Sequence, residues 1–158
     1  MLTGSLAMNY YAQPRMTRDI DIVVALDSHD VDRVRQAIGK DYYFPDDNLD
    51  SLIKDASMFN IVHLESVVKV DIIVRKPGQY REHEFGRRML VQIADFKAWI
   101  VSKEDLILSK LDWAKDTKSE MQLRDVKNLL TASPDMEYLR RWAPELNVNA
   151  LLEECRHG

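Results

Sequence analysis

Three aspartates set in β-like sequence are the residues of this chain best suited to chemistry. Asp19 and Asp21 stand two positions apart in an alternating run, so in a strand both carboxylates project from one face. Carboxylates at this spacing can hold one or two divalent cations, and Mg²⁺ suits them because it prefers hard oxygen ligands. Asp71 interrupts another apolar run, where an unpaired charge is costly. If these runs are neighbouring strands, the three acids converge.

A Gly-Ser pair precedes the acids and adds a phosphate-binding element. Gly4 and Ser5 are followed by thirteen residues and then by Asp19. The pair leads into a predicted helix over residues 6–12, whose free amide groups and positive dipole end suit a phosphate. An Asp-X-Asp alone is more often a solvated strand face, and a Gly-Ser alone is a weak signal. The presence of Asp71 and the position of Gly4-Ser5 before the Asp-X-Asp favour a cation and phosphate site over a solvated strand face.

Hydrophobic periodicity predicts the elements that must position these residues. Residues 18–26 alternate before a β-branched run, which is typical of a strand entering a buried sheet. Residues 58–64 and 67–75 are typical of a hairpin, and we expect two further strands of the same sheet at 89–93 and 98–101. The predicted helices cover residues 6–12, 28–39, 49–53, 102–117 and 119–131, with two shorter helices around Pro134 and Pro144. These elements predict an α/β (α+β) protein, with residues 1–101 as a core and residues 102–158 as a helical segment packed on it.

Composition bounds the class of protein. The chain has 158 residues, of which 46% are hydrophobic and 30% charged, so it is long enough to bury a core. The formal charge of -4 argues against a domain that coats nucleic-acid backbone, but it allows a small anionic substrate with a metal escort. Cys155 is the single cysteine, so no internal disulfide forms and a reducing cytoplasm is the default. No leader pattern or membrane span is predicted, so we expect a cytoplasmic protein without membrane partners.

Taken together, Gly4-Ser5, Asp19-Ile20-Asp21 and Asp71 resemble the signature of the nucleotidyltransferase superfamily with the DNA polymerase beta-like fold. The sequence over residues 2–24 is similar to small bacterial and archaeal nucleotidyltransferase-like proteins, which are related to abortive-infection and toxin-antitoxin nucleotidyltransferases. The resemblance extends to about residue 131. It continues through residues 57–63, 69–73, 102–111 and 122–130.

The resemblance implies a fold, a reaction and roles for the acids. It implies a mixed twisted sheet flanked by helices, with a C-terminal helical segment. It also implies transfer of a nucleoside monophosphate from a nucleoside triphosphate to a hydroxyl acceptor, with release of pyrophosphate. Asp19 and Asp21 would ligate two Mg²⁺ ions, or Mn²⁺, and Asp71 would complete the site of the ion that activates the hydroxyl. Gly4 and Ser5 would hold phosphates. The acceptor, whether a small molecule, a protein or RNA, stays open.

Further residues have two interpretations each. Arg15, Thr17 and Arg18 precede the acidic strand, and the resemblance implies that they shape the edge of the nucleotide site, with Arg15 as a phosphate contact. Solvated loop arginines are equally compatible, with Arg18 free to pair with an acid. Lys110 matches a family lysine that would approach the triphosphate, but an exposed helix lysine has the same pattern. Trp113, three residues on, could stack on a base, although core packing is the commoner role of a helix tryptophan.

Other functions fit the same residues. A non-catalytic protein that binds a nucleotide or a partner, as one member of a toxin-antitoxin pair, would keep the scaffold. Hydrolysis of the nucleotide, with water as acceptor, would use the same acids. The C-terminal helices allow a homodimer, although no heptad repeat demands one. His63 is expected to be a structural, hydrogen-bonded histidine.

The N-terminal edge of the predicted sheet is short. The family has a helix and a strand before its Gly-Ser turn, whereas only three residues precede Gly4 here. We therefore expect that the true start lies upstream, or that a stub strand or a segment of a partner completes the sheet edge.

Overall fold

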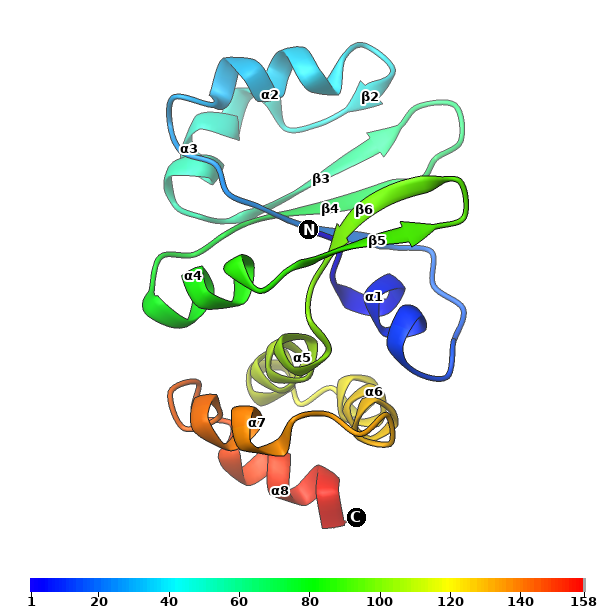
Figure 1. Cartoon of the computed structure of the whole chain (residues 1–158). Coiled ribbons are helices and arrows are strands. Elements are labelled where there is room, and N and C mark those ends of the chain that lie inside the picture. The colour runs from blue at the N-terminus through cyan, green and yellow to red at the C-terminus, as the bar shows by residue number, and fades with distance from the viewer. Residues whose placement is uncertain (158) are drawn as a thin grey trace.

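The central sheet combines strands that lie far apart in the sequence (Figure 1). In the computed structural model, which describes residues 1–157, four strands follow the spatial order β1-β4-β3-β2. Strand β1 (Ile20–Val24) runs parallel to β4 (Lys69–Val74), and β3 (Met58–His63) runs antiparallel to β4. The short β2 (Tyr42–Tyr43) pairs with the outer edge of β3. The prediction of a mixed α/β protein and of a β3-β4 hairpin is confirmed.

Alternation along the strands separates an apolar face of the sheet from an acidic one. Ile72 and Val74 of β4 face α2 (Val31–Ile38) and α3 (Leu49–Lys54), whereas Asp71 points to the opposite face. The apolar face forms its own core cluster under these two helices. Its buried members are Val31, Leu49, Ile53, Phe59 and Val74. Helices α2 and α3 therefore cover the apolar face of the sheet, and Asp71 lies on the opposite face.

Strands β5 (Met89–Ile93) and β6 (Phe96–Ile100) form a separate antiparallel ribbon. The prediction that they are strands of the central sheet holds only through the bridges of Leu2, since neither pairs directly with β1–β4 in the described residues, and β6 begins at residue 96 rather than 98. The only β-bridges between ribbon and sheet within the described residues are made by Leu2, which pairs with Ile22 on one side and Ile100 on the other. The chain turns into a helix at Gly4, so no continuous strand joins the two. Leu2 therefore acts as a stub strand at the sheet edge, which is one of the alternatives expected from the sequence.

Helices on the acidic side come from both ends of the chain. Helix α1 (Gly4–Tyr11) begins two residues earlier than predicted, and its Ala7 and Met8 are buried against the C-terminal helices. Helix α4 (Gln79–Gly86) was not predicted, because its sequence is mostly polar. It forms because its polar side chains find partners, among them Glu84, which accepts hydrogen bonds from Arg81 and Ser109.

The C-terminal helices surround a central one. Helix α5 (Lys103–Thr117) is buried on several sides, and α6 (Glu120–Leu130), α7 (Met136–Trp142) and α8 (Asn149–His157) share its core. Ser102 accepts the amide hydrogen of Asp105 at the start of α5, which confirms the predicted cap. No helix in the described part of the chain is long and apolar enough to cross a membrane.

The buried Asp105 joins three helices. Its carboxylate accepts hydrogen bonds from Tyr80 of α4, from Tyr138 of α7 and from Arg87 after α4. The side chain has no exposed surface. Several donors around one carboxylate compensate its desolvation, so this network fixes α4 and α7 on α5.

Candidate functional site

A cleft of about 520 Å³ lies between the acidic face of the sheet and helix α5. Its floor comes from β1, β4 and β3, and its walls come from the start of α1, from α4 and from α5. The volume lies in the range of small-molecule sites. The residues named below that line it are Gly4, Ser5, Asp21, Asp71, Arg81, Glu84, Ser109, Lys110, Asp112, Trp113, Asp116, Thr117 and Gln122.

Asp21 and Asp71 are direct neighbours in the parallel register of β1 and β4. They project from the same face into the cleft, and Asp71 is 9% exposed. On the next strand Asn60 is the register partner of Asp71, and its amide donates a hydrogen bond to that carboxylate. The sheet thus brings together two acids that are 50 positions apart in the chain.

Asp19 lies just before β1 and is largely exposed outside the cleft. Its link to the other acids is Lys69, whose ammonium lies 3.7 Å from the carboxylate of Asp19 and 3.1 Å from that of Asp71. Within residues 1–157 no three Asp, Glu, His or Cys side chains form a ready-made metal cage. The structure therefore joins Asp21 with Asp71 directly and Asp19 with Asp71 through a lysine.

The electrostatics of Asp21 differ from those of its neighbours. Burial raises the pKa of the Asp21 carboxyl above its ordinary value, and the charges of Asp71 and Asp19 raise it further. Lys110 and Lys69 oppose this effect. Within the described residues no side chain donates a hydrogen bond to the carboxylate of Asp21, which faces the cleft, and only the more distant charges of Lys110 and Lys69 compensate it.

Gly4 lies directly against the carboxylate of Asp21. Its φ of +61° lies in the left-handed region, and a Cβ built on it would lie 1.9 Å from Oδ2 of Asp21. The glycine is therefore needed both for the turn into α1 and for the space that the carboxylate occupies. This packing reason adds to the phosphate approach expected from the sequence.

We expect Gly4→Ala to destabilise the fold by about 1–3 kcal/mol through backbone strain and to displace Asp21. Gly39→Ala is the matched control, because Gly39 also has a positive φ of +70° but has no atom within 4 Å of a built Cβ. Urea unfolding should show a loss of stability in both variants, whereas divalent-cation binding should fail only for Gly4→Ala. Equal cation binding in the two variants would contradict the role given to Gly4.

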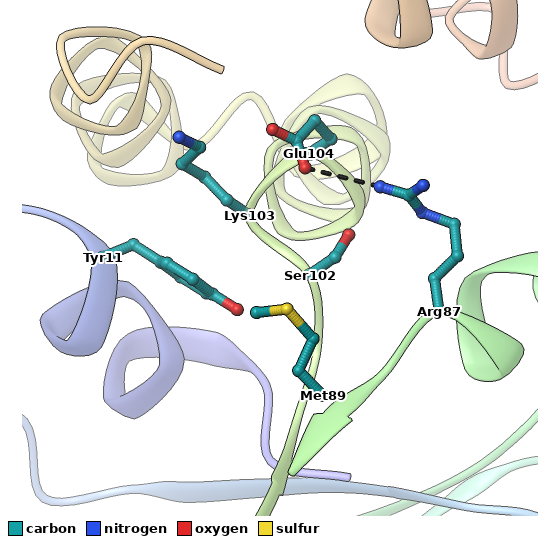
Figure 2. Close-up of a pocket in the computed structure, with 6 residues that line it drawn as sticks. All are labelled: Tyr11, Arg87, Met89, Ser102, Lys103 and Glu104. Carbon is teal, nitrogen blue, oxygen red and sulfur yellow. Dashed lines mark hydrogen bonds and ion pairs between the residues drawn. The ribbon is translucent and has the colours of Figure 1, made fainter. Parts of the chain in front are cut away.

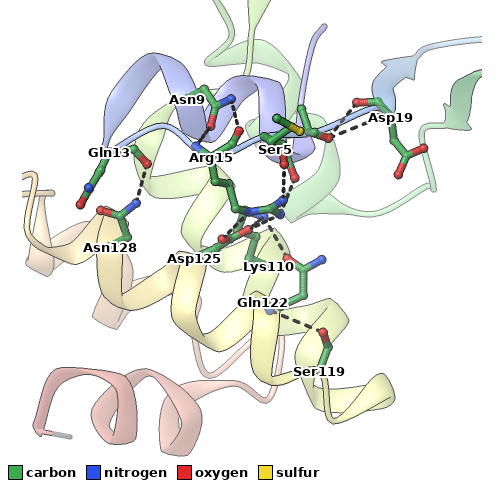
Figure 3. A network of polar contacts seen from close by, with 12 residues as sticks. Ser5, Asn9, Gln13, Arg15, Asp19, Lys110, Ser119, Gln122, Asp125 and Asn128 are labelled. Atoms are coloured by element: carbon green, nitrogen blue, oxygen red, sulfur yellow. Dashed lines mark hydrogen bonds and ion pairs between the residues drawn. The ribbon is translucent and has the colours of Figure 1, made fainter. Parts of the chain in front are cut away.

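Arg15 connects the start of α1 with α6 (Figure 3). Its guanidinium donates to the hydroxyl of Ser5 at 2.6 Å and, with two nitrogens, to both carboxylate oxygens of Asp125 at 2.9 Å. Two hydrogen bonds between Asn9 and the backbone of Arg15 hold the loop. Arg15 does not line the cleft itself but positions Ser5, which does.

Lys110 is buried and faces the same acid. Its ammonium lies 2.7 Å from Asp125 and 2.9 Å from the amide oxygen of Gln122, and its side chain is 4% exposed. The interpretation of Lys110 as an exposed helix lysine is wrong. Burial lowers the pKa of Lys110, although its bond to Asp125 opposes this. Burial alone would raise the pKa of Asp125, but the bonds from Arg15 and Lys110 hold it below its ordinary value.

Asp125 was not predicted as a site residue. A signal was present, since Asp125 lies one helical turn before Leu129 on the buried face of a predicted helix, where a charge needs a partner. The sequence does not say which cation supplies it, because Arg15 is 110 positions away.

Two other predicted site residues stay outside the cleft. The hydroxyl of Thr17 accepts the amide hydrogen of Asp19 at 3.3 Å and shapes the loop before β1. Arg18 is exposed and forms no ion pair with Asp21 in the described part of the chain. His63 hydrogen-bonds Ser66 at 2.8 Å, which confirms a structural role.

Trp113 is not a core residue. Its side chain is 50% exposed and lines the cleft one helical turn after Lys110, so the favoured interpretation of core packing is wrong. The buried side of α5 is already occupied by Leu111 and Ala114. The helix therefore leaves its tryptophan on the open side.

A second hollow of about 380 Å³ lies between Tyr11, Met89 and the start of α5 (Figure 2). Its polar groups serve the fold: Tyr11 donates to the carbonyl of Val101, and Lys103 donates to two carbonyls after α6. Arg87 pairs with Glu104 at 3.5 Å. This hollow lacks the paired acids of the cleft.

No protein-family model matches this chain, and no curated protein matches its sequence.

Proposed function

We propose that this protein is a metal-dependent nucleotidyltransferase with a DNA polymerase beta-like fold. It would move a nucleoside monophosphate from a nucleoside triphosphate to a hydroxyl acceptor and release pyrophosphate. The observation that carries the proposal is the juxtaposition of Asp21 and Asp71 on adjacent parallel strands, facing the buried Lys110 across one cleft. A nucleoside triphosphate with its metal ion requires carboxylates to bind the metal and a cationic side chain to bind the phosphates.

The donor set fits Mg²⁺ or Mn²⁺. Asp21 and Asp71 offer hard oxygen ligands from adjacent strands, and Asp19, outside the cleft, is linked to Asp71 through Lys69. A bound cation would relieve the repulsion that raises the pKa of Asp21. When bound, such ions neutralise triphosphate charge and favour ionisation of the attacking hydroxyl.

The remaining residues would bind and orient the triphosphate. Lys110 offers a positive charge from a buried position, and Asp125 with Gln122 fixes its direction. Ser5, held by Arg15, lies at the start of α1, where free backbone amides suit phosphate oxygens. The chain thus contributes positioning and charge neutralisation, which dominate catalysis of phosphoryl transfer.

A direct assay tests the proposal. The protein is incubated with each of the four nucleoside triphosphates and Mg²⁺, and pyrophosphate release is followed with and without EDTA. Candidate hydroxyl acceptors are supplied as small molecules, proteins and total RNA, and the products are examined for a transferred nucleoside monophosphate. Release of phosphate instead of pyrophosphate would indicate hydrolysis of the terminal phosphate and would contradict nucleotidyl transfer.

The position of Lys69 favours a second candidate, a nucleotide-binding protein without catalysis. Its ammonium lies between Asp19 and Asp71, where it neutralises part of the charge that would attract cations. Such a protein would act by binding a partner in a toxin-antitoxin type system. Calorimetry of nucleotides with Mg²⁺ separates the two, because binding without pyrophosphate release is the result expected of the second candidate alone.

Lys69 supplies a further prediction. We expect Lys69→Met to tighten Mn²⁺ binding about tenfold, because the substitution removes a positive charge that lies 3.1 Å from the Asp71 carboxylate and would repel a cation held there. Lys97→Met, on the exposed edge of β6, is the control. Calorimetric titration with Mn²⁺ measures both affinities. Binding that weakens in Lys69→Met would show that Lys69 organises the acids instead of competing with the cation.

A further inference from the structure

Trp113 is an aromatic surface inside the cleft that the proposed reaction does not yet use. Its indole is 50% exposed although it lines a cavity between two layers of the fold. Of the other tryptophans, Trp142 is buried in the helical core and Trp99 lies on the ribbon outside the cleft. A large apolar side chain left open in a cleft is a ready contact for a ligand with a flat apolar face.

Helix α5 orders the contacts along the cleft. Lys110, Trp113 and Thr117 lie one turn apart in succession, so they form a row about 10 Å long on one face. A triphosphate held at Lys110 therefore has Trp113 as the next wall residue toward the C-terminus of the helix.

The flank of α5 that contacts α4 is closed by existing hydrogen bonds and ion pairs. Ser109 donates to Glu84 at 2.6 Å, and Arg81 donates to Ser109 and Asp112. These polar groups satisfy one another between α4 and α5, so they offer little to a ligand. Two other polar groups that line the cleft, the carboxylate of Asp116 and the side-chain amide nitrogen of Gln122, make no hydrogen bond within residues 1–157.

We propose that Trp113 is the stacking platform for the base of the nucleoside triphosphate, with Asp116 and Gln122 at the edge of the base. This inference rests on the proposed function, and it identifies the nucleobase end of the same site. A base has a π-face whatever its identity, so Trp113 contributes affinity for all four nucleotides, and groups at the base edge discriminate among them.

The test compares ligands with and without a base. Binding of ATP, CTP and inorganic tripolyphosphate, each with Mg²⁺, is measured by calorimetry for the unaltered protein and for Trp113→Ala. We expect the variant to bind ATP and CTP about 5- to 150-fold more weakly, the range of a lost base–aromatic stack, and to bind tripolyphosphate unchanged. Trp113→Phe should recover most of the lost affinity, since it keeps a ring.

Trp99→Ala is the matched control, because Trp99 is 47% exposed but lies outside the cleft. It should leave all three affinities unchanged. In Trp99→Phe, where Trp113 is the exposed indole that remains, nucleotide should quench tryptophan fluorescence and tripolyphosphate should not.

The possible outcomes distinguish failure of the stacking role of Trp113 from failure of the proposed function. Equal nucleotide affinity in Trp113→Ala and in the unaltered protein overturns the stacking role alone. An equal loss for tripolyphosphate also overturns it, since Trp113 would then shape the phosphate end. If the unaltered protein binds tripolyphosphate as tightly as ATP and CTP, the base adds no affinity, the cleft binds another anion, and both the stacking role and the nucleotide function are overturned. If it binds none of the three ligands, the proposed function itself fails, and the stacking role fails with it.

Discussion

Asp21→Asn is expected to reduce Mg²⁺-dependent pyrophosphate release by about 10³-fold or more, because a correctly held metal ion contributes several kcal/mol to such a transition state. The substitution keeps the shape of the side chain and removes its charge. The protein should remain folded, since no side chain in the described residues donates to Asp21. The activity assay and urea unfolding are to be run on the same preparations.

The same substitution is expected to increase stability in metal-free buffer. The pKa of folded Asp21 is raised above its ordinary value of 3.8 by burial and by Asp71 and Asp19. Between the ordinary and the raised pKa the folded state binds more protons than the unfolded state, so stability falls as pH rises through that window. At neutral pH the ionised group therefore opposes folding, and asparagine removes this effect. Below pH 4 the difference between the variant and the unaltered protein should shrink.

Asp71 should behave differently, although its role in the reaction is parallel. It accepts the amide of Asn60 and the ammonium of Lys69, so Asp71→Ala is expected to lose activity and also about 1 kcal/mol of stability. Asp95→Asn, in the exposed turn of the ribbon, serves as the control for a lost aspartate charge.

If Asp21→Asn keeps full activity, the assignment of Asp21 as a metal ligand is wrong. If it loses stability, the account of uncompensated charge is wrong.

The second large effect concerns Asp125. Asp125→Ala is expected to cost about 3–5 kcal/mol of unfolding free energy, because it leaves Lys110 buried without a counter-charge. That loss is a large part of the stability of a typical domain. Glu120→Ala is the matched control on the same helix. Its partner Arg124 lies 3.7 Å away and both side chains are at least 80% exposed, so little change is expected.

A double variant keeps this prediction testable if Asp125→Ala does not fold. Replacing the pair together, as Lys110→Met with Asp125→Leu, removes both buried charges and should recover most of the lost stability. The double variant should still fail to bind nucleotide, since the cation that faces the cleft is gone. A double variant as unstable as Asp125→Ala would show that the cost does not come from the unpaired Lys110 but from packing or from the lost bonds of Arg15 to Asp125.

The contribution of Asp125 to the free energy of unfolding should also be measurable in the unaltered protein, as a loss of stability at acidic pH. The pKa of Asp125 in the folded state is held below its ordinary value of 3.8, so the unfolded state binds more protons in the window between the two values. The stabilisation is therefore present at neutral pH and is lost as pH falls through the lower pKa. The double variant should show a weaker dependence of unfolding free energy on pH below 4.

Local patterns determined much of this protein. Alternation along the strands predicted that Asp21 and Asp71 share one face of the sheet, because successive side chains of a strand point to opposite faces, whereas Asp19 lies before β1 and outside the cleft. The Ser102 cap and the hairpin before Asp71 were predicted for the same reason, since each depends on a few consecutive residues. Helix α4 was not predicted because it lacks an apolar stripe and is held on α5 by polar contacts, the ion pair of Arg81 with Asp112 and the hydrogen bond from Ser109 to Glu84.

Only the tertiary structure decided which of these residues meet. The pairing of β1 with β4, the burial of Lys110 against Asp125, and the opening of Trp113 toward the cleft all join segments distant in the chain. Periodicity states which side of an element is apolar, but it does not state which element lies opposite. That choice depends on how two separate clusters of apolar side chains pack, one beneath the sheet and one around α5. The acids lie on the sheet face away from the first cluster and the buried lysine on the helix at the centre of the second, so their encounter is a property of the folded chain.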